Sequence, residues 1–326
     1  MRALRLLAVV AGLSVSTNIG WTCCMAFNED SPMTLVGERA IIVWDAARQR
    51  EHFVREASFD GEAKDFGFIV PAPTKPDVAE ADEEAFEELE RLVPVPRPRT
   101  DTDSVAAAAD EGAESVELIE QYMVGDFEVS VLKGTDGAAI NGWLKANSYT
   151  SRPGMEAWLD HYAKMGWFFA ALKFVRGEGQ ESSETTAVRV SFDTDVPFYP
   201  YKMPSDTWPE GHYRPISLYF VSIGVARGKY RGGDGEWEAK VRWSGDLPRE
   251  TATKLASLVS LDQMDIPEGA TVTVFQNTAN AQGYEYDVYF LTYTSVLPTW
   301  LVIVIAVAVI GGLAYALIKS RRSAPG

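Results

Sequence analysis

The chain has 326 residues and a formal net charge of −16, with 46 acidic against 30 basic side chains. A surplus of acids repels the phosphate backbone, so this composition argues against a nucleic-acid-binding protein. The only two cysteines are Cys23 and Cys24. The fold must therefore rest on a hydrophobic core rather than on a disulfide framework, and the length makes such a core feasible.

Residues 1–22 are predicted to be a secretory signal peptide. Two arginines precede an apolar run from Leu6 to Val15, and small polar residues follow. This run is too short to span a bilayer comfortably, and its flanks are those of a signal. A disulfide between the neighbours Cys23 and Cys24 would be strained. They are either ordinary residues at the signal boundary, a lipidation site or the site of a disulfide to another chain.

Hydrophobic periodicity in the body predicts a series of strands and helices. The ranges 38–45, 51–59 and 65–71 form an expected antiparallel meander, which Pro71 and Pro73 end. Further strands are expected at 116–124, 127–133, 167–175, 186–192, 216–225, 236–243, 270–275 and 284–292. Helices are expected to begin near Asp82, Asp136, Pro153 and Pro248. The glycine-rich range 227–235 is expected to be the tip of a long hairpin.

These elements predict the α+β class, in one extracytoplasmic domain with a largely antiparallel sheet and several helices. The domain is expected to cover 23–295, with a flexible acidic loop at 94–115 that is rich in proline and alanine.

A membrane-spanning helix is predicted near the end of the chain, within 296–318. Residues 300–318 are nineteen uncharged, mostly apolar residues, about 28 Å of helix, which matches the hydrocarbon core of a bilayer. Trp300 suits the headgroup layer at the start, and the tail 319–326 carries Lys319, Arg321 and Arg322. By the positive-inside rule the tail is cytoplasmic. We expect a single-pass type I protein of a bacterial cytoplasmic membrane, with its body on the outer side.

Motifs that carry chemistry are scarce. The histidines His52, His161 and His212 are far apart and do not stand at metal-ligand spacing. The sequence contains no nucleophile elbow, and the glycine-rich range lacks the lysine of a phosphate loop. We therefore predict no metal and no cofactor.

Two carboxylates, Asp193 and Asp195, stand two residues apart at the end of a predicted strand, so both would point to one face. Such a pair can bind a cation or share a proton, and Asp65 is a third candidate for a catalytic group. Aspartates at a strand end also simply form turns.

The stretch 196–213 interleaves aromatic rings with prolines. Its rings belong to Phe198, Tyr199, Tyr201, Trp208 and Tyr213. A stiff segment rich in rings can form a surface for sugars or peptides, or it can pack over a sheet as part of the core.

Two stretches carry a resemblance to a known family. The first is FDGEAKDFGFIVPAP at 59–73. The second combines the region from Asp126 to Gly137 with TAVRVSFDTDVPFYPYKM at 186–203, joined through the helix ending HYAKMGWFFAALKF. With a cysteine directly after the signal, residues 23–225 resemble the bacterial family called domain of unknown function 2330. The resemblance implies a secreted or membrane-tethered protein and no assigned activity. The pair Cys23-Cys24 departs from the family's cysteine followed by glycine.

The sequence favours a binding or interaction module without enzymatic activity. Its expected partners are the bilayer, through 300–318, and an extracytoplasmic protein or glycan, but no nucleic acid. The alternative is an extracytoplasmic hydrolase in which carboxylates such as Asp65, Asp193 and Asp195 converge in the fold.

Overall fold

The fold is given by a computed structural model, which describes residues 25–27, 34–60, 66–94, 116–149, 151, 153–175, 187–205, 216–232, 235–277 and 285–294. Cys23, Cys24, the range 95–115 and the predicted membrane segment 300–318 lie outside these residues, as do Trp300, Lys319, Arg321 and Arg322. Across the described ranges, no helix is long and apolar enough to cross a bilayer.

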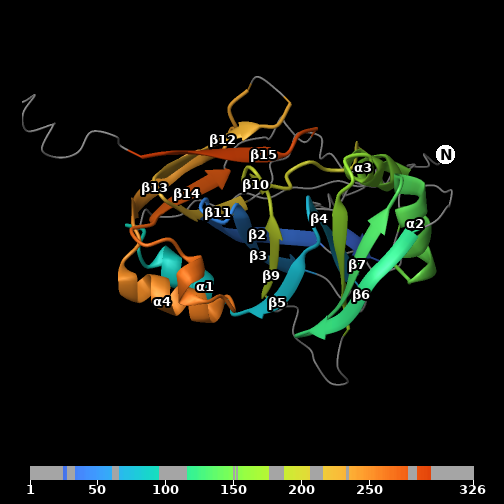
Figure 1. Ribbon diagram of the computed structural model, residues 1–326, viewed down its shortest axis with the longest axis horizontal. Helices are drawn as coiled ribbons and strands as arrows, with labels where there is room; N and C mark the ends of the chain where they lie inside the picture. Colours follow the sequence, from blue (N-terminus) through green and yellow to red (C-terminus); the bar gives the residue numbers. More distant parts are fainter. Residues whose placement is uncertain are drawn as a thin grey trace, which may run out of the picture.

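A seven-stranded sheet forms the centre of the molecule, in the order β13-β14-β11-β2-β3-β9-β5 (Figure 1). Its strands are Thr34–Asp45 (β2), Arg50–Asp60 (β3), Asp77–Ala81 (β5), Ala187–Asp193 (β9), Ile216–Ser222 (β11), Lys240–Asp246 (β13) and Thr271–Asn277 (β14). Strands β2 and β11 run parallel, and the other neighbours run antiparallel. The tight β2–β3 hairpin was predicted.

Two smaller antiparallel sheets flank the central one. The first has the order β1-β4-β8-β7-β6, with Met25–Phe27 (β1), Phe66–Ala72 (β4), Val116–Val124 (β6), Phe127–Gly134 (β7) and Phe168–Phe174 (β8). The second has the order β10-β15-β12, with Phe198–Tyr199 (β10), Val225–Tyr230 (β12) and Val288–Tyr293 (β15). The predicted class, α+β with largely antiparallel strands, is confirmed, although the strands form three sheets rather than one.

The helices lie in two pairs at opposite ends of the molecule. They are Glu84–Glu90 (α1), Gly137–Ala146 (α2), Pro153–Ala163 (α3) and Arg249–Leu258 (α4). Helices α1 and α4 lie together below the central sheet, and α2 and α3 lie beside β6 and β7 (Figure 1). As the sequence predicts, Asp136 caps α2: its Oδ1 accepts a hydrogen bond of 2.8 Å from Ala139 N.

Strand alternation divides the core in two. Ala40, Ile42 and Trp44 of β2 belong to a large cluster between the central sheet and the flanking sheets, together with residues of α2 and α3. Ile41 and Val43 point to the opposite face, into a smaller cluster with α1 and α4. Because successive side chains of a strand point to opposite faces, a strand buried on both faces is apolar throughout.

The predicted meander is wrong in its third strand. Strand β4 leaves β3 and pairs with β1 and β8 in another sheet. Its residues 67–72 are buried throughout, as expected of a strand covered on both faces. Pro71 stays within the strand opposite Phe169, beyond the residues that pair with β1. Its missing N–H therefore removes no hydrogen bond to β1.

The predicted hairpin tip at 227–235 is also partly wrong. Residues Val225–Tyr230 form β12, which pairs with β15. The sharp turn lies earlier, at Gly224, whose φ of 84° favours glycine. Gly228 serves packing instead, since a Cβ there would lie 2.8 Å from a ring carbon of Trp237.

Candidate functional site

An open pocket of about 370 Å³ lies between one end of the central sheet and the loop that follows α4. Strands β3, β5 and β9 contribute Arg50, His52, Asp77, Arg189 and Ser191 to its walls. The loop contributes Ser260, Leu261, Asp262 and Asp265. Eight of these nine side chains are polar or charged, so the pocket suits a small polar molecule.

The floor of the pocket contains a histidine–serine pair. His52 on β3 stands opposite Ser191 on β9, and His52 Nδ1 lies 2.8 Å from Ser191 Oγ. Both residues are buried, with Ser191 only 1% exposed. Among the described residues, His52 Nε2 has no hydrogen-bond partner. Burial, aided by the positive charge of Arg189, lowers the pKa of His52 to about 4, so the ring is neutral at pH 7.

The buried guanidinium of Arg189 holds the loop to the sheet. Its Nη1 donates to the carbonyl oxygens of Val259 and Ser260, at the C-terminal end of α4, where a cation is favoured. Its Nη2 donates to Asp77 Oδ2 at 2.7 Å. Its Nε is buried and has no partner in the described part of the chain. A buried donor without a partner costs about 1–3 kcal/mol.

Acids outnumber bases around the pocket. Arg48 borders it and bonds Asp45 at 2.7 Å and Asp265 at 3.1 Å. Arg50 reaches Asp193 at 2.6 Å. Together with Arg189, Asp77 and Asp262, the pocket and its border hold three arginines and five aspartates. The rim is therefore acidic, while the floor contains the buried nitrogens His52 Nε2 and Arg189 Nε.

The buried histidine predicts a loss of stability in acid. Unfolded His52 takes up a proton near pH 6.5, whereas the folded residue does so only near pH 4. Between these values the unfolded chain binds more protons, so the free energy of unfolding falls as the pH falls. The full loss is about 3 kcal/mol. Chemical denaturation of the full-length protein at pH 7 and at pH 4 measures this loss. We expect the contribution of His52 to be absent in His52→Gln.

Asp287 changes the free energy of unfolding in the opposite direction as the pH falls. The pH dependence of the wild type must therefore be compared with that of His52→Gln. Burial raises the pKa of Asp287 to about 6, despite hydrogen bonds from Lys202 N and Tyr162 Oη. The folded chain therefore gains stability as the pH falls through 6. This term is common to wild type and His52→Gln and cancels in their difference. A difference that stays constant from pH 7 to pH 4 would contradict the depressed pKa of His52.

Of the three carboxylates that the sequence suggested, the structure describes Asp193 and Asp195. Asp65 lies outside the described residues. Asp193 ends β9, where it is mostly exposed and paired with Arg50, and Asp195 is exposed in the turn that follows. No three His, Cys, Asp or Glu side chains in the described ranges are placed to hold a metal ion.

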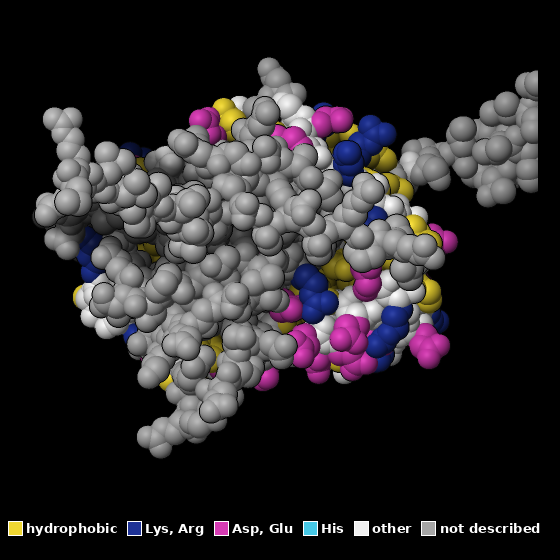
Figure 2. All heavy atoms as spheres, turned by 180° about the vertical axis from the view of Figure 1, so that it is seen from behind, with side chains coloured by type: hydrophobic (Ala, Val, Ile, Leu, Met, Phe, Trp, Pro, Cys, Tyr) yellow, Lys and Arg dark blue, Asp and Glu magenta, His cyan; other side chains and the backbone are white. Residues whose placement is uncertain are grey.

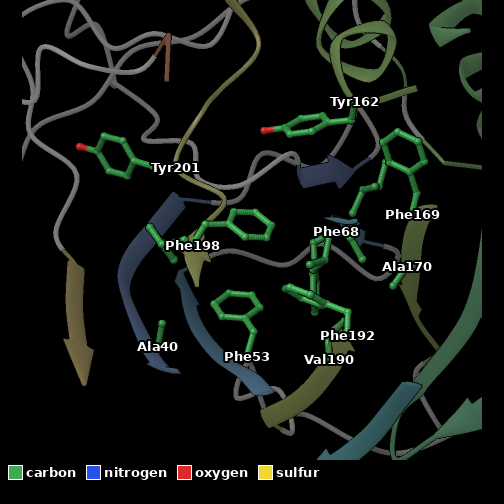
Figure 3. Packing of buried hydrophobic residues seen from close by; sticks show 14 of the residues in the cluster. Ala40, Phe53, Phe68, Tyr162, Phe169, Ala170, Val190, Phe192, Phe198 and Tyr201 are labelled. Carbon is green, nitrogen blue, oxygen red and sulfur yellow. The ribbon is translucent and has the colours of Figure 1, made fainter. Parts of the chain in front are cut away.

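The described part of the aromatic segment lies in the core. Phe198, Tyr199 and Tyr201 are fully buried, and Trp208 and Tyr213 lie outside the described residues. Figure 3 shows Phe198 among the rings of the large cluster, near Phe53 and Phe192. The packing alternative therefore describes these three rings, and a ligand cannot reach them in this structure.

Buried acids hold this segment in place. Phe198 N donates to Glu51 Oε2 at 2.8 Å, and Tyr199 Oη donates to Glu38 at 2.8 Å. Lys202 N donates to Asp287 at 3.1 Å. Burial raises the pKa of Glu51 well above its usual value.

Sequence reasoning missed the pocket. It placed His52 in a predicted strand, far from the other histidines, but did not predict that its side chain is buried beside Ser191. One signal was present: Arg189 and Ser191 alternate with the apolar Val188, Val190 and Phe192 of the same strand, which places the two polar residues on one face. The loop at 260–265 is far away in sequence, and no local pattern connects it to β9.

The fold and site define an α+β protein with an acidic surface pocket. The family described as "Uncharacterized protein conserved in bacteria (DUF2330)" matches residues 20–258, and the chain belongs to this family. The resemblance seen in the sequence is thereby confirmed. No curated protein matches the chain.

Two solved structures of baculovirus P35 show a distant likeness. The crystal structure of baculovirus P35 is 9% identical, with 79% of this chain and 91% of that chain covered and a TM-score of 0.34. A mutated baculovirus P35 after caspase cleavage is also 9% identical, with 78% and 93% covered and a TM-score of 0.31. We draw nothing from a likeness at this level.

Proposed function

We propose that the chain is a membrane-tethered extracytoplasmic module that binds a small zwitterion, of the amino-acid type, in the acidic pocket. The signal-like N-terminus, the apolar segment 300–318 and the basic tail support the tether and its orientation. The observation that carries the binding role is the pair of buried nitrogens without partners, His52 Nε2 and Arg189 Nε, at the pocket floor.

The floor suits the negative end of a ligand. Arg189 Nε carries a hydrogen and needs an acceptor, and Arg50 adds a second guanidinium to the wall. A carboxylate oxygen is the acceptor that arginine pairs with best. Both floor nitrogens are closed to solvent in the free protein. Binding therefore includes a small displacement of the 260–265 loop.

The rim suits the positive end. Asp77 and Asp262 are both exposed there, and the pocket and its border have two more carboxylates than guanidinium groups. An ammonium group between these carboxylates forms charge-assisted hydrogen bonds. A ligand with both groups matches the floor and the rim at once.

Calorimetric titration of the detergent-solubilised full-length protein tests the proposal. The panel contains glycine, alanine and lysine as zwitterions, acetate as a carboxylate, ethylamine as an amine and glucose as a neutral solute. We expect saturable binding of at least one zwitterion and weaker binding of acetate and ethylamine. Asp262→Asn and Arg50→Gln should each weaken binding about tenfold, since a charge-assisted hydrogen bond contributes about 1.5–3 kcal/mol.

Glu268→Gln is the matched control. Glu268 is exposed six residues after Asp262 and does not line the pocket, so its variant should bind like the wild type. The proposal is wrong if no zwitterion binds, or if Asp262→Asn and Arg50→Gln bind as tightly as the control.

A hydrolase is the second candidate, because Ser191 Oγ and His52 Nδ1 lie within hydrogen-bond distance, as a nucleophile and its base do. One observation weighs against it: a histidine with a pKa of about 4 is a weak base. If the protein hydrolyses p-nitrophenyl acetate and Ser191→Ala does not, the hydrolase replaces the binding module.

A further inference from the structure

The outer face of the β12–β15 pair is apolar and basic. Strand register places Val225 opposite Tyr293, Arg227 opposite Leu291 and Lys229 opposite Tyr289, of which Lys229 and Tyr289 are half-buried. The alternate residues Ala226, Tyr230, Val288 and Phe290 face inward, into the large core cluster. Val225 is 41% and Tyr293 48% exposed, and Ile223 at the preceding turn is also exposed.

A tight turn makes this face rigid at one end. Gly224 passes so close to β15 that a Cβ would lie 2.7 Å from the carbonyl oxygen of Tyr293. Ser222 Oγ donates to the carbonyl oxygen of Gly224 at 3.1 Å. The guanidinium of Arg227 lies over the Tyr293 ring, 5.2 Å from its centre. The apolar and basic side chains at this end of the face are therefore held next to each other by the fold.

Its charge sets this face apart from the rest of the chain. Strands β12 and β15 contain Arg227 and Lys229 but no acid. After Asp287 the remaining 39 residues contain no Asp or Glu, in a chain with 46 acids. Without the five positive charges of its two ends, the rest of the chain carries −21, so most of its surface is repelled by an anionic bilayer. The exposed acids near these strands are Glu236, which bridges to Lys229 along β12, and Asp246, which lies two strands from Ser222.

The position of the face in the chain points to its occupant. Strand β15 ends at Tyr293, at the left of Figure 1. Figure 2 is turned by 180°, so this end falls on its right, where hydrophobic, basic and acidic side chains lie together at the upper margin. Only residues 294–299 separate Tyr293 from Trp300, where the proposed membrane helix begins. Such a connection spans at most about 25 Å.

We propose that the outer face of β12 and β15, with Ile223, Val225, Tyr293, Arg227 and Lys229, lies flat on the anionic bilayer in which the chain is anchored. The inference rests on the proposed membrane tether but not on the pocket ligand. Aromatic and aliphatic side chains enter the headgroup layer, and the two basic side chains pair with lipid phosphates. The body is thereby held in one orientation, with its acidic surfaces directed away from the bilayer.

Depth-dependent fluorescence quenching tests the contact. Full-length protein with Cys23→Ser and Cys24→Ser receives one new cysteine, through Val225→Cys or Met264→Cys, and a polarity-sensitive dye. The protein is reconstituted into nanodiscs of phosphatidylglycerol and phosphatidylcholine that contain a headgroup nitroxide lipid. Met264 is the control, because it is 75% exposed, more than any other large apolar residue that the structure describes, and belongs to the loop on the opposite side of the central sheet.

We expect quenching and a blue shift for the dye at 225 and neither for the dye at 264. Arg227→Gln and Lys229→Gln should each lower the ratio of docked to free protein about fivefold, and phosphatidylcholine alone should weaken docking similarly.

Carbonate extraction of the same membranes separates the outcomes. If the chain stays in the membrane but the dye at 225 is as little quenched as the dye at 264, the docking inference is wrong and the tether stands. If carbonate releases the chain, the tether itself is wrong and the inference falls with it.

Discussion

Replacing Arg55 by methionine is expected to lower the free energy of unfolding by about 3–5 kcal/mol. Arg55 Nε donates to Glu38 Oε1 at 2.9 Å, and the two side chains are 1% and 0% exposed. The guanidinium also lies over the Phe68 ring, 4.6 Å from its centre. The substitution takes the guanidinium of Arg55 away from a buried carboxylate, and the loss of one partner of a buried ion pair is among the most costly single changes in a core.

The same hairpin supplies a matched control. Arg39 and Glu56 form an ion pair at 2.5 Å between β2 and β3, one register position away, but the side chain of Arg39 is 36% exposed, against 1% for Arg55. Because water reaches the half-buried Arg39 and screens this pair, Arg39→Met should cost clearly less than Arg55→Met. Adding Glu38→Gln to Arg55→Met removes the stranded charge and should restore part of the loss. Chemical denaturation followed by tryptophan fluorescence measures all three. Equal losses in Arg55→Met and Arg39→Met would contradict a buried, uncompensated charge.

Phe198→Ala is expected to have a comparable effect, about 3–5 kcal/mol. Phe198 is fully buried, and its ring lies 5.1 Å from Trp167 and 5.5 Å from Phe192, centre to centre. Its removal leaves a cavity where the central sheet, β8 and the β10–β15 pair meet. Phe198→Leu refills part of the space and should cost less than Phe198→Ala, which keeps the comparison informative if the alanine variant fails to fold.

Val196→Ala tests the same stretch of chain without the cavity. Val196 stands two residues earlier and is partly exposed, so its truncation should change stability by less than about 1 kcal/mol. If Phe198→Ala is as stable as Val196→Ala, the ring is not a core residue, and the aromatic segment becomes available again as a recognition surface.

Local patterns of the sequence predicted most of the elements. The strand at 186–192 and the helix that begins at Pro153 were both expected, because alternation and helical spacing can be recognised in neighbouring residues. The cap at Asp136 was expected for the same reason.

Pairing of strands was harder to predict because it depends on partners far away in sequence. Strand β4 was assigned to β3, its neighbour in the chain, whereas it pairs with β8, about a hundred residues later. The glycines of 227–235 were interpreted as a turn, because nothing nearby shows that Trp237 packs against Gly228.

The pocket shows the same limit. His52, Ser191 and the loop at 260–265 meet only when β3, β9 and the end of α4 are placed together. The sequence pointed instead to Asp193, Asp195 and the aromatic rings, which are prominent in composition. In the structure Arg50 pairs with Asp193, and the described rings are buried.

A body outside the cytoplasmic membrane is the premise of both proposals, and protease treatment of intact spheroplasts tests it most directly. With epitope tags before residue 25 and after residue 326, we predict that external protease removes the N-terminal tag and degrades the body. A C-terminal fragment that contains 300–326 should remain, protected in the membrane. A body that survives intact, together with loss of the C-terminal tag from outside, would contradict the proposed topology and with it the extracytoplasmic binding module.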